Sequence, residues 1–199
     1  MSYIDETLIF ESDKIYYKAA NDSIDMEVMM DWEDAIMKKS ADYVCENGGD
    51  ILEIGFGMGI AANYIQANSI NSHTIVENHP QIIEKAKAWA ADKPNVTIIE
   101  SDWNTVKDKR RKICLATYDG IFYDTHMDYR SSLLSSSLSN LTKNRTRFTY
   151  WNSNDPSNDS SQMNLSNVTY KTISVSPTIS SSQYFPSGST TYYMPMREF

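Results

Sequence analysis

Three glycines at alternate positions follow a short apolar segment near residue 50. Gly55, Gly57 and Gly59 come directly after residues 50–54, which are typical of a buried strand, and they precede a helical pattern. Glycine at these positions lets the backbone turn sharply and approach a ligand closely. Glu77 ends the next expected strand, where a carboxylate can accept both hydroxyl groups of a ribose. The loop and the acid together indicate a site for a nucleoside-containing cofactor.

The glycine loop alone leaves the cofactor open. Gly57, Gly59 and Ala62 also satisfy the dinucleotide fingerprint G-x-G-x-x-A, so an NAD-dependent oxidoreductase is one alternative. Glu53, inside the strand before the loop, is a feature of Rossmann-like methyltransferases, and a reversed hairpin expected near the C-terminal end resembles the last strand of that class. These two features favour S-adenosylmethionine (SAM), with S-adenosylhomocysteine as its product. A glycine turn that binds nothing is the remaining interpretation.

Asp102 and Trp103 follow the third expected strand, residues 95–100. In Rossmann-like methyltransferases an acid at this position contacts the adenine amino group, and an aromatic or apolar side chain covers the ring. A helix N-cap beside a core tryptophan is the structural alternative. The position after the third strand favours the adenine contact.

Apolar periodicity predicts the elements that position these residues. A helical pattern begins at Met26 and ends before Gly48, which supplies a stop. Strands and helices then alternate as far as Asn152, which is typical of a parallel sheet covered by helices. The predicted strands are 50–54, 73–77, 95–100, 118–124 and 147–152, and the predicted helices are 59–67, 79–91, 103–112 and 128–142.

Two β-rich stretches, 168–175 and 190–196, follow without room for a packed helix between them. Strands joined in this way pair antiparallel. We therefore expect an α/β fold of the Rossmann-like class I methyltransferase type. Its mostly parallel seven-stranded sheet ends in an antiparallel hairpin, and helices cover both of its faces.

Length and composition predict one domain over residues 1–199, with an irregular arm over 1–25, a turn around 14–20, and a core over 26–199. The net charge of −8 disfavours a nucleic-acid partner, because phosphate binding needs a basic face. No window approaches the roughly 18 apolar residues of a membrane span, and no signal peptide is apparent. We therefore expect a cytoplasmic protein that contacts no membrane. The two cysteines are far apart, so no metal site is expected.

Separated motifs resemble one family. The segments VMMDWEDAIM (28–37), NGGDILEIGFGMGIA (47–61) and DGIFYDTH (119–126) resemble guanidinoacetate methyltransferase and its relative, the fungal arginine δ-N-methyltransferase. IVENHPQII (75–83) looks closer to the latter, and YFPSGSTTYYMPM (184–196) is similar to the end of both. The resemblance extends from about residue 26 to the end of the sequence and is weak between 128 and 190.

The resemblance implies a set of cofactor contacts. Met29 and Met37 are expected to flank the methionine and adenosine parts of SAM. Glu77, Asn78 and His79 are expected at the ribose and adenine edge. The other implied contacts are Phe56, Gly57, Met58, Gly59, Ile60, Ala61, Asp102 and Trp103.

The resemblance also implies an acceptor site built from two acids. Glu33, of the W-E pair, and Asp124, of the Y-D-T motif, are expected to grip a guanidino group. A guanidinium has a pKa above about 12 and offers no lone pair to a methyl group. A carboxylate bonded to its N–H groups orients it and can take a proton as the nitrogen attacks. Asn152 and Asn154 follow the fifth expected strand and are candidate substrate contacts.

Two departures from the family leave the acceptor open. The N-terminal arm has no match to the family's lid, although Tyr16 and Tyr17 are candidates for that role, and residues 155–166 are shorter and more polar than in relatives. The expected activity is SAM-dependent N-methylation of guanidinoacetate, another guanidino compound, or arginine in a protein. The alternatives are a SAM-binding protein without methyl transfer and a methyltransferase with a different small-molecule acceptor.

Overall fold

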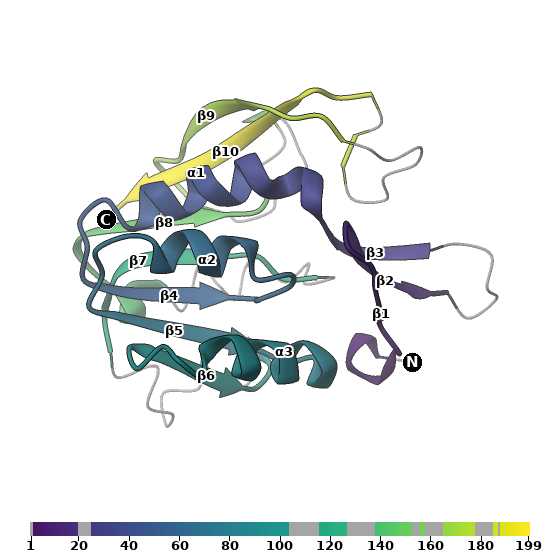
Figure 1. Ribbon diagram of the computed structural model, residues 1–199. Coiled ribbons are helices and arrows are strands. Elements are labelled where there is room, and N and C mark those ends of the chain that lie inside the picture. The colour runs from purple at the N-terminus through teal and green to yellow at the C-terminus, as the bar shows by residue number, and fades with distance from the viewer. Residues whose placement is uncertain are drawn as a thin grey trace.

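The structure, a computed structural model, describes residues 2–19, 25–103, 116–126, 138–152, 156–157, 165–177, 185–186 and 188–199. Its elements are, in chain order, η1 (Tyr3–Asp5), β1 (Ile9–Phe10), β2 (Lys14–Lys18), β3 (Asp25–Met30), η2 (Asp31–Glu33), α1 (Asp34–Val44), β4 (Asp50–Ile54), α2 (Ile60–Gln66), β5 (Ser72–Glu77), α3 (Pro80–Ala90), β6 (Val96–Glu100), β7 (Tyr118–Tyr123), β8 (Thr142–Tyr150), β9 (Thr169–Ser174) and β10 (Thr191–Glu198). The strands form a three-stranded sheet, β1-β2-β3, and a seven-stranded sheet ordered β6-β5-β4-β7-β8-β10-β9. Figure 1 shows the smaller sheet beyond the carboxyl ends of β4, β5 and β6.

The larger sheet is mostly parallel. Its strands β6, β5, β4, β7 and β8 all run in one direction, and β4 at the centre is buried at four of its five residues. β10 runs antiparallel to both β8 and β9 and lies between them. The expected seven-stranded sheet with a terminal antiparallel hairpin is therefore confirmed, with the reversed strand one place inside the edge.

Helices α1, α2 and α3 cover one face of this sheet (Figure 1). α1 packs against β7, β8, β9 and β10, and α3 packs against β6. The opposite face is buried by an apolar cluster that includes Trp103, Leu138 and Leu141. Residues 138–141 are helical, whereas most of the helices predicted over 103–112 and 128–142 lies outside the described residues. Within the described part of the chain, no helix is long and apolar enough to cross a membrane.

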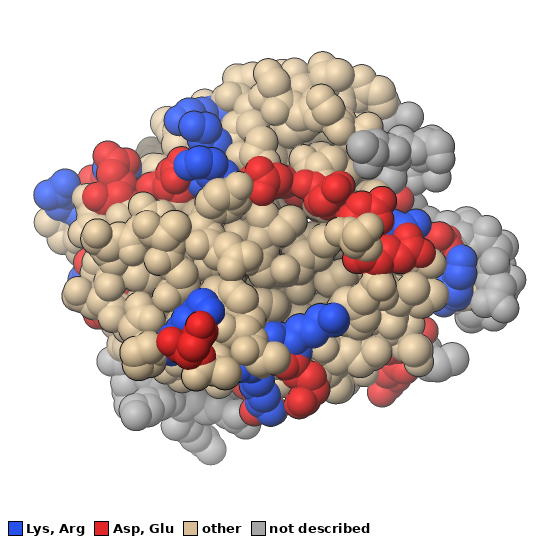
Figure 2. All heavy atoms as spheres, viewed as in Figure 1, with Lys and Arg blue, Asp and Glu red and all other residues tan. Residues whose placement is uncertain are grey.

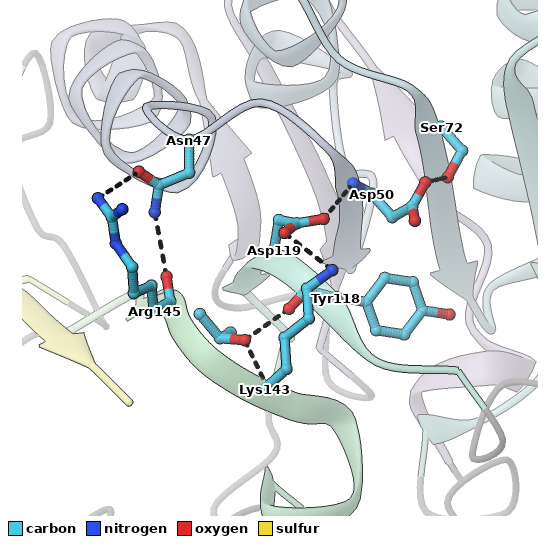
Figure 3. A network of polar contacts seen from close by, with 8 residues as sticks. Asn47, Asp50, Ser72, Tyr118, Asp119, Lys143 and Arg145 are labelled. Carbon is cyan, nitrogen blue, oxygen red and sulfur yellow. Dashed lines mark hydrogen bonds and ion pairs between the residues drawn. The ribbon is translucent and has the colours of Figure 1, made fainter.

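A polar network joins the amino ends of the central strands, at the end of the sheet away from the N-terminal sheet (Figure 3). The carboxylate of Asp119 accepts a hydrogen bond from the backbone N–H of Asp50 at 2.8 Å and pairs with Lys143 Nζ at 2.8 Å. Ser72 Oγ donates to Asp50 Oδ1 at 2.6 Å, which adds β5 to the same network. These contacts fix the register of four strands without entering the candidate site described below.

The N-terminal region differs from the expectation. The irregular arm predicted for residues 1–25, with a turn around 14–20, is wrong, because β1 pairs antiparallel with β2 and β2 pairs antiparallel with β3. β3 also spans the predicted boundary between arm and core at residues 25 and 26. Antiparallel pairing of strands that follow one another along the chain creates this sheet, and apolar periodicity within each short strand carries little of that information.

The helix predicted from Met26 begins later than expected. Residues 25–30 form β3, a single 3-10 turn follows, and α1 begins at Asp34. The apolar spacing before Asp34 fits a helix, but tertiary pairing with β2 overrides it. Strand β8 differs as well: it begins at Thr142 rather than at residue 147 and ends at Tyr150.

Candidate active site

A cavity of about 490 Å³ lies at the carboxyl ends of β4, β5 and β7. Residues 2–4 and part of β3 line its other side. Parallel α/β sheets bind their ligands at this edge, where loops from several strands meet. The predicted residues in the lining are Met29, Met37, Phe56, Gly57, Ala61, Glu77, Asn78, Asp102, Trp103 and Asp124.

The glycine loop brings backbone unusually close to other groups. Gly55 has φ +92°, and a Cβ atom there would lie 1.7 Å from the carbonyl oxygen of Asp124. Gly57 has φ +55°, and a Cβ atom there would lie 2.4 Å from Met29 Sδ. Met58 N–H donates to that same sulfur at 3.0 Å. Glycine suits both positions, because a side chain at 55 would collide with the backbone of Asp124, and a side chain at 57 would push aside the flexible end of Met29.

Glu77 is held in place by three backbone N–H groups. Phe56 N donates to its Oε2 at 2.9 Å, and Asn78 N and His79 N donate to its Oε1 at 2.8 and 2.9 Å. The carboxylate is buried, and it lines the cavity. Oε2 accepts only one of these bonds and keeps a second lone pair, so the group can still accept a hydroxyl donor from a ligand. Its position is fixed before any ligand arrives.

Trp103 and Asp102 lie at the far side of the cavity, after β6. Trp103 is buried, and in the described structure its indole N–H has no hydrogen-bond partner. Asp102 is exposed at the cavity margin. An aromatic ring beside a carboxylate suits the flat face and amino edge of a base, so the geometry is compatible with the predicted adenine contact.

Asp124 and Glu33 approach one region from different elements. Asp124 follows β7, and its backbone N–H donates to Ile54 O at 2.8 Å, which fixes it to the end of β4. Glu33 ends η2 and is buried, although it lies outside the cavity lining. Glu33 Oε1 accepts from Met30 N at 2.9 Å, and Oε2 accepts from Trp151 Nε1 at 2.7 Å.

The electrostatics of Asp124 reflect its surroundings. Burial raises its pKa well above the usual carboxyl range, and the negative charges of Glu33, Glu53 and Glu77 raise it further. Three other carboxylates therefore lie close enough to act on Asp124. A cationic ligand relieves this repulsion, whereas an anionic ligand adds to it. The site suits cationic groups.

Glu53 lines the cavity, and a buried histidine lies next to its carboxylate. His73 Nε2 lies 2.8 Å from Glu53 Oε2, and both side chains are fully buried. Gln66 contacts the other ring nitrogen of His73 at 3.3 Å. Burial raises the pKa of Glu53, and His73 opposes that shift. Glu53 marked the methyltransferase class in the sequence, but its place in the cavity was not predicted.

The N-terminal residues line part of the site, which was not predicted from the sequence. The ring of Tyr3 lies 4.7 Å from that of His126 and 4.9 Å from that of His79, and both Tyr3 and His126 line the cavity. Burial lowers the pKa of His126 to about 4, so this side chain is neutral at pH 7. Tyr17, a candidate lid residue, meets His126 edge-on at 5.8 Å. The only signal in the sequence for a contribution from the N-terminal region was the Tyr16–Tyr17 pair.

Several predicted residues lie outside the lining. The ring of His79 is used within the fold, because its Nδ1 accepts from Gln81 N and its Nε2 contacts Glu6 O. Asn152 is buried and its side-chain amide donates to Tyr193 O at 3.2 Å, so its contact with a substrate stays a prediction. The others are Met58, Gly59, Ile60 and Glu33. Asn154 lies outside the described residues.

Solved structures share this fold. Spermidine synthase from Thermotoga maritima gives a TM-score of 0.61 at 13% identity and covers 96% of this chain and 72% of its own. Precorrin-6y C5,15-methyltransferase from Geobacter metallireducens GS-15 gives a TM-score of 0.59 at 13% identity, with 91% and 92% covered. At this identity the likeness concerns the fold alone, and it confirms the Rossmann-like class I methyltransferase architecture.

Closer relatives appear among characterised sequences. Protein arginine N-methyltransferase 2 of Yarrowia lipolytica is 35% identical over 143 residues, which cover 67% of this chain and 29% of that protein. The Saccharomyces cerevisiae protein of the same name is 35% identical over 143 residues, with 66% and 32% covered. The chain thus spans less than a third of the length of these relatives. The model of the guanidinoacetate N-methyltransferase family matches residues 10–149, more than half of the chain. The chain therefore belongs to the guanidinoacetate N-methyltransferase family.

Proposed function

We propose that this chain is a SAM-dependent N-methyltransferase that methylates a guanidino nitrogen, either of a small molecule such as guanidinoacetate or of arginine in a protein. The observation that carries the proposal is a group of carboxylates at one edge of the sheet: Asp124 directly after β7 and Glu77 at the end of β5 line the cavity, and the charge of the buried Glu33 acts on Asp124. Both the proposed donor and the proposed acceptor are cations, and this group of acids suits them.

The proposed donor side comprises the glycine loop, Glu77 and the pair Asp102–Trp103. Glu77 accepts the ribose hydroxyls, since backbone N–H groups already hold its carboxylate. Trp103 and Asp102 face the adenine, and Met29 covers the loop at Gly57. When bound, SAM supplies a methyl group on a sulfonium, and the bonding electrons stay on sulfur as the methyl group leaves.

The proposed acceptor side comprises Glu33 and Asp124. Two carboxylates bonded to the N–H groups of one planar cation fix its orientation, which is most of what an in-line transfer requires. Asp124 takes one guanidinium proton as the nitrogen lone pair forms the new N–C bond. Its raised pKa suits this role, because a base works best when its pKa lies near the working pH.

The surface near the acceptor side carries acidic groups. Figure 2 shows red side chains along the N-terminal end of α1 toward the N-terminal sheet. Asp31 and Asp34 are exposed there. Negative potential at a cavity entrance raises the local concentration of a cationic substrate. We further propose that residues 1–199 act as one cytoplasmic domain with no nucleic-acid or membrane partner.

Methyl transfer tests the proposal directly. The chain is incubated with methyl-labelled SAM and, separately, with guanidinoacetate, free arginine and an arginine-rich protein, and the labelled product is identified by mass spectrometry. We expect label on a guanidino nitrogen of at least one acceptor. SAM binding by calorimetry without transfer to any of them would refute the guanidino activity and support a binding protein or a different acceptor. Binding of NAD in place of SAM would refute the cofactor.

A further inference from the structure

Glu33 is a buried carboxylate whose two oxygens are held by N–H donors from different elements. Met30 N donates to one oxygen at 2.9 Å, and the indole N–H of Trp151 donates to the other at 2.7 Å. The second distance is that of a hydrogen bond to a charged acceptor. Donors of this kind stabilise the ionised form of a carboxylate.

Trp151 is also fixed to the strand that carries Asp124. Its backbone N–H donates at 2.9 Å to the carbonyl of Tyr123, the residue directly before Asp124. Its ring packs against Phe185 and Tyr192, with centroid distances of 6.4 and 6.0 Å. One residue thus contacts Glu33 through its side chain and the Asp124 strand end through its backbone.

The two acids do not share the same surroundings. Glu33 receives the Trp151 donor, whereas burial and the neighbouring negative charges, Glu33 first among them, raise the pKa of Asp124. When two interacting carboxylates have different environments, they take different roles. An acid that stays ionised can hold a cation, and an acid that binds protons more readily can accept one.

We propose that Trp151 is a positioning residue that holds Glu33 ionised and aimed at the acceptor, so that Asp124 is left as the proton acceptor. This inference rests on the proposed guanidino methylation. It adds that the division of roles between the acids depends on one indole N–H group located outside the cavity.

Trp32 offers a matched control for a substitution at Trp151. It belongs to the same aromatic cluster, with its ring 5.2 Å from Phe185, and it is buried, whereas Trp151 is partly buried. In the described structure its indole N–H has no partner. Trp→Phe removes aromatic contacts of the same cluster at both positions, but a hydrogen bond to Glu33 only at Trp151.

The test compares Trp151→Phe with Trp32→Phe in the methyl-transfer assay. Loss of a hydrogen bond to a charged group predicts a roughly 10- to 100-fold fall in kcat/KM for Trp151→Phe, and less than about 3-fold for Trp32→Phe. The acid limb of the pH profile of kcat/KM should move to higher pH only for Trp151→Phe, because Glu33 then binds a proton more readily. In a Glu33→Gln background, Trp151→Phe should have little further effect.

A second measurement tests the inference even if Trp151→Phe does not fold. In the ¹⁵N-tryptophan-labelled wild-type chain, one indole N–H resonance should shift with pH, and Glu33→Gln should abolish that titration. Three outcomes would each overturn the inference. The first is an equal loss of kcat/KM in the two tryptophan variants, and the second is an effect of Trp151→Phe that adds to that of Glu33→Gln. The third is the lack of any indole resonance that responds to Glu33→Gln. Absence of guanidino methylation by the wild-type chain would instead refute the proposed function itself.

Discussion

The two sides of the cavity are built in different ways. On the proposed donor side, backbone N–H groups from the ends of two adjacent strands hold Glu77, and glycines bring the loop close to it. On the proposed acceptor side, side chains from distant elements meet: Glu33 from η2, Asp124 after β7 and Trp151 after β8. The donor side is therefore a local structure, and the acceptor side depends on the whole fold.

This difference has a consequence for substitutions. A carboxylate held by backbone groups keeps its geometry when neighbouring side chains change. A carboxylate held by another side chain loses its position when that one residue changes. We therefore expect that a few substitutions on the proposed acceptor side can change its specificity without changing the affinity of the proposed donor side.

Asp124→Asn should have the largest effect on activity. This effect should be confined to the proposed acceptor side. The amide can orient a guanidino group but cannot take its proton, so kcat should fall by roughly 10²- to 10⁴-fold. The Kd for SAM, measured by calorimetry, should stay within about 3-fold, on the order of 0.6 kcal/mol. Asp119→Asn, on the same strand in the network of Figure 3, is the control and should leave both values unchanged. Equal losses in the two variants would mean that β7 is merely destabilised.

Glu77→Gln should affect the opposite side. A single amide oxygen cannot accept from Phe56, Asn78 and His79 together, and the charge is lost, so the Kd for SAM should rise roughly 10- to 100-fold. The KM for the acceptor at saturating SAM should change little. Glu100→Gln, at the aligned position of β6 and exposed, is the control. A larger change in acceptor KM than in SAM affinity would contradict the assignment of the two sides.

Gly57→Ala separates backbone strain from steric conflict. Its φ of +55° predicts a stability loss of about 1–2 kcal/mol, as for any L residue in that region. Gly188 has φ +77°, and a Cβ atom there would meet no other atom within 4 Å, so Gly188→Ala carries the strain alone. Thermal melting should show a loss of stability for both variants. Only Gly57→Ala should also weaken SAM binding, since its Cβ would displace Met29, and equal SAM affinity in both variants would contradict this.

The smallest expected effect is on the pH dependence of stability. The pKa of Asp124 is raised in the folded state, so the folded chain binds more protons than the unfolded chain above about pH 4. Its contribution to the free energy of unfolding therefore falls as pH rises toward the folded-state pKa. Asp124→Asn should raise the melting temperature at pH 8 relative to wild type by more than it does at pH 4. Parallel melting curves across this range would show that Asp124 is not destabilised by its neighbours.

The grouping of residues on the proposed donor side could be predicted from the sequence because these residues are close in the chain. The strand before Gly55, the glycine spacing and the position of Glu77 follow from local pattern, and the structure brings them to one cavity. The small N-terminal sheet could not be predicted in this way. Its strands pair across turns, and the helical spacing before Asp34 concealed β3.

The acceptor side was predicted only through family resemblance. Nothing in the local pattern around Glu33 separates a buried acid from a solvated helix residue. Its partner, Trp151, is more than a hundred positions away in the sequence. The two segments meet because α1, which follows Glu33, packs against β8, which precedes Trp151.

A crystal structure with S-adenosylhomocysteine and a guanidino acceptor tests the central claim most directly. Arginine or guanidinoacetate would serve as the acceptor, according to which one the chain methylates. We predict that carboxylate oxygens of both Glu33 and Asp124 lie within about 2.7–3.2 Å of guanidino nitrogens, with Trp151 still donating to Glu33. A guanidino group bound away from these two acids, or acids that turn away from it, would contradict the account.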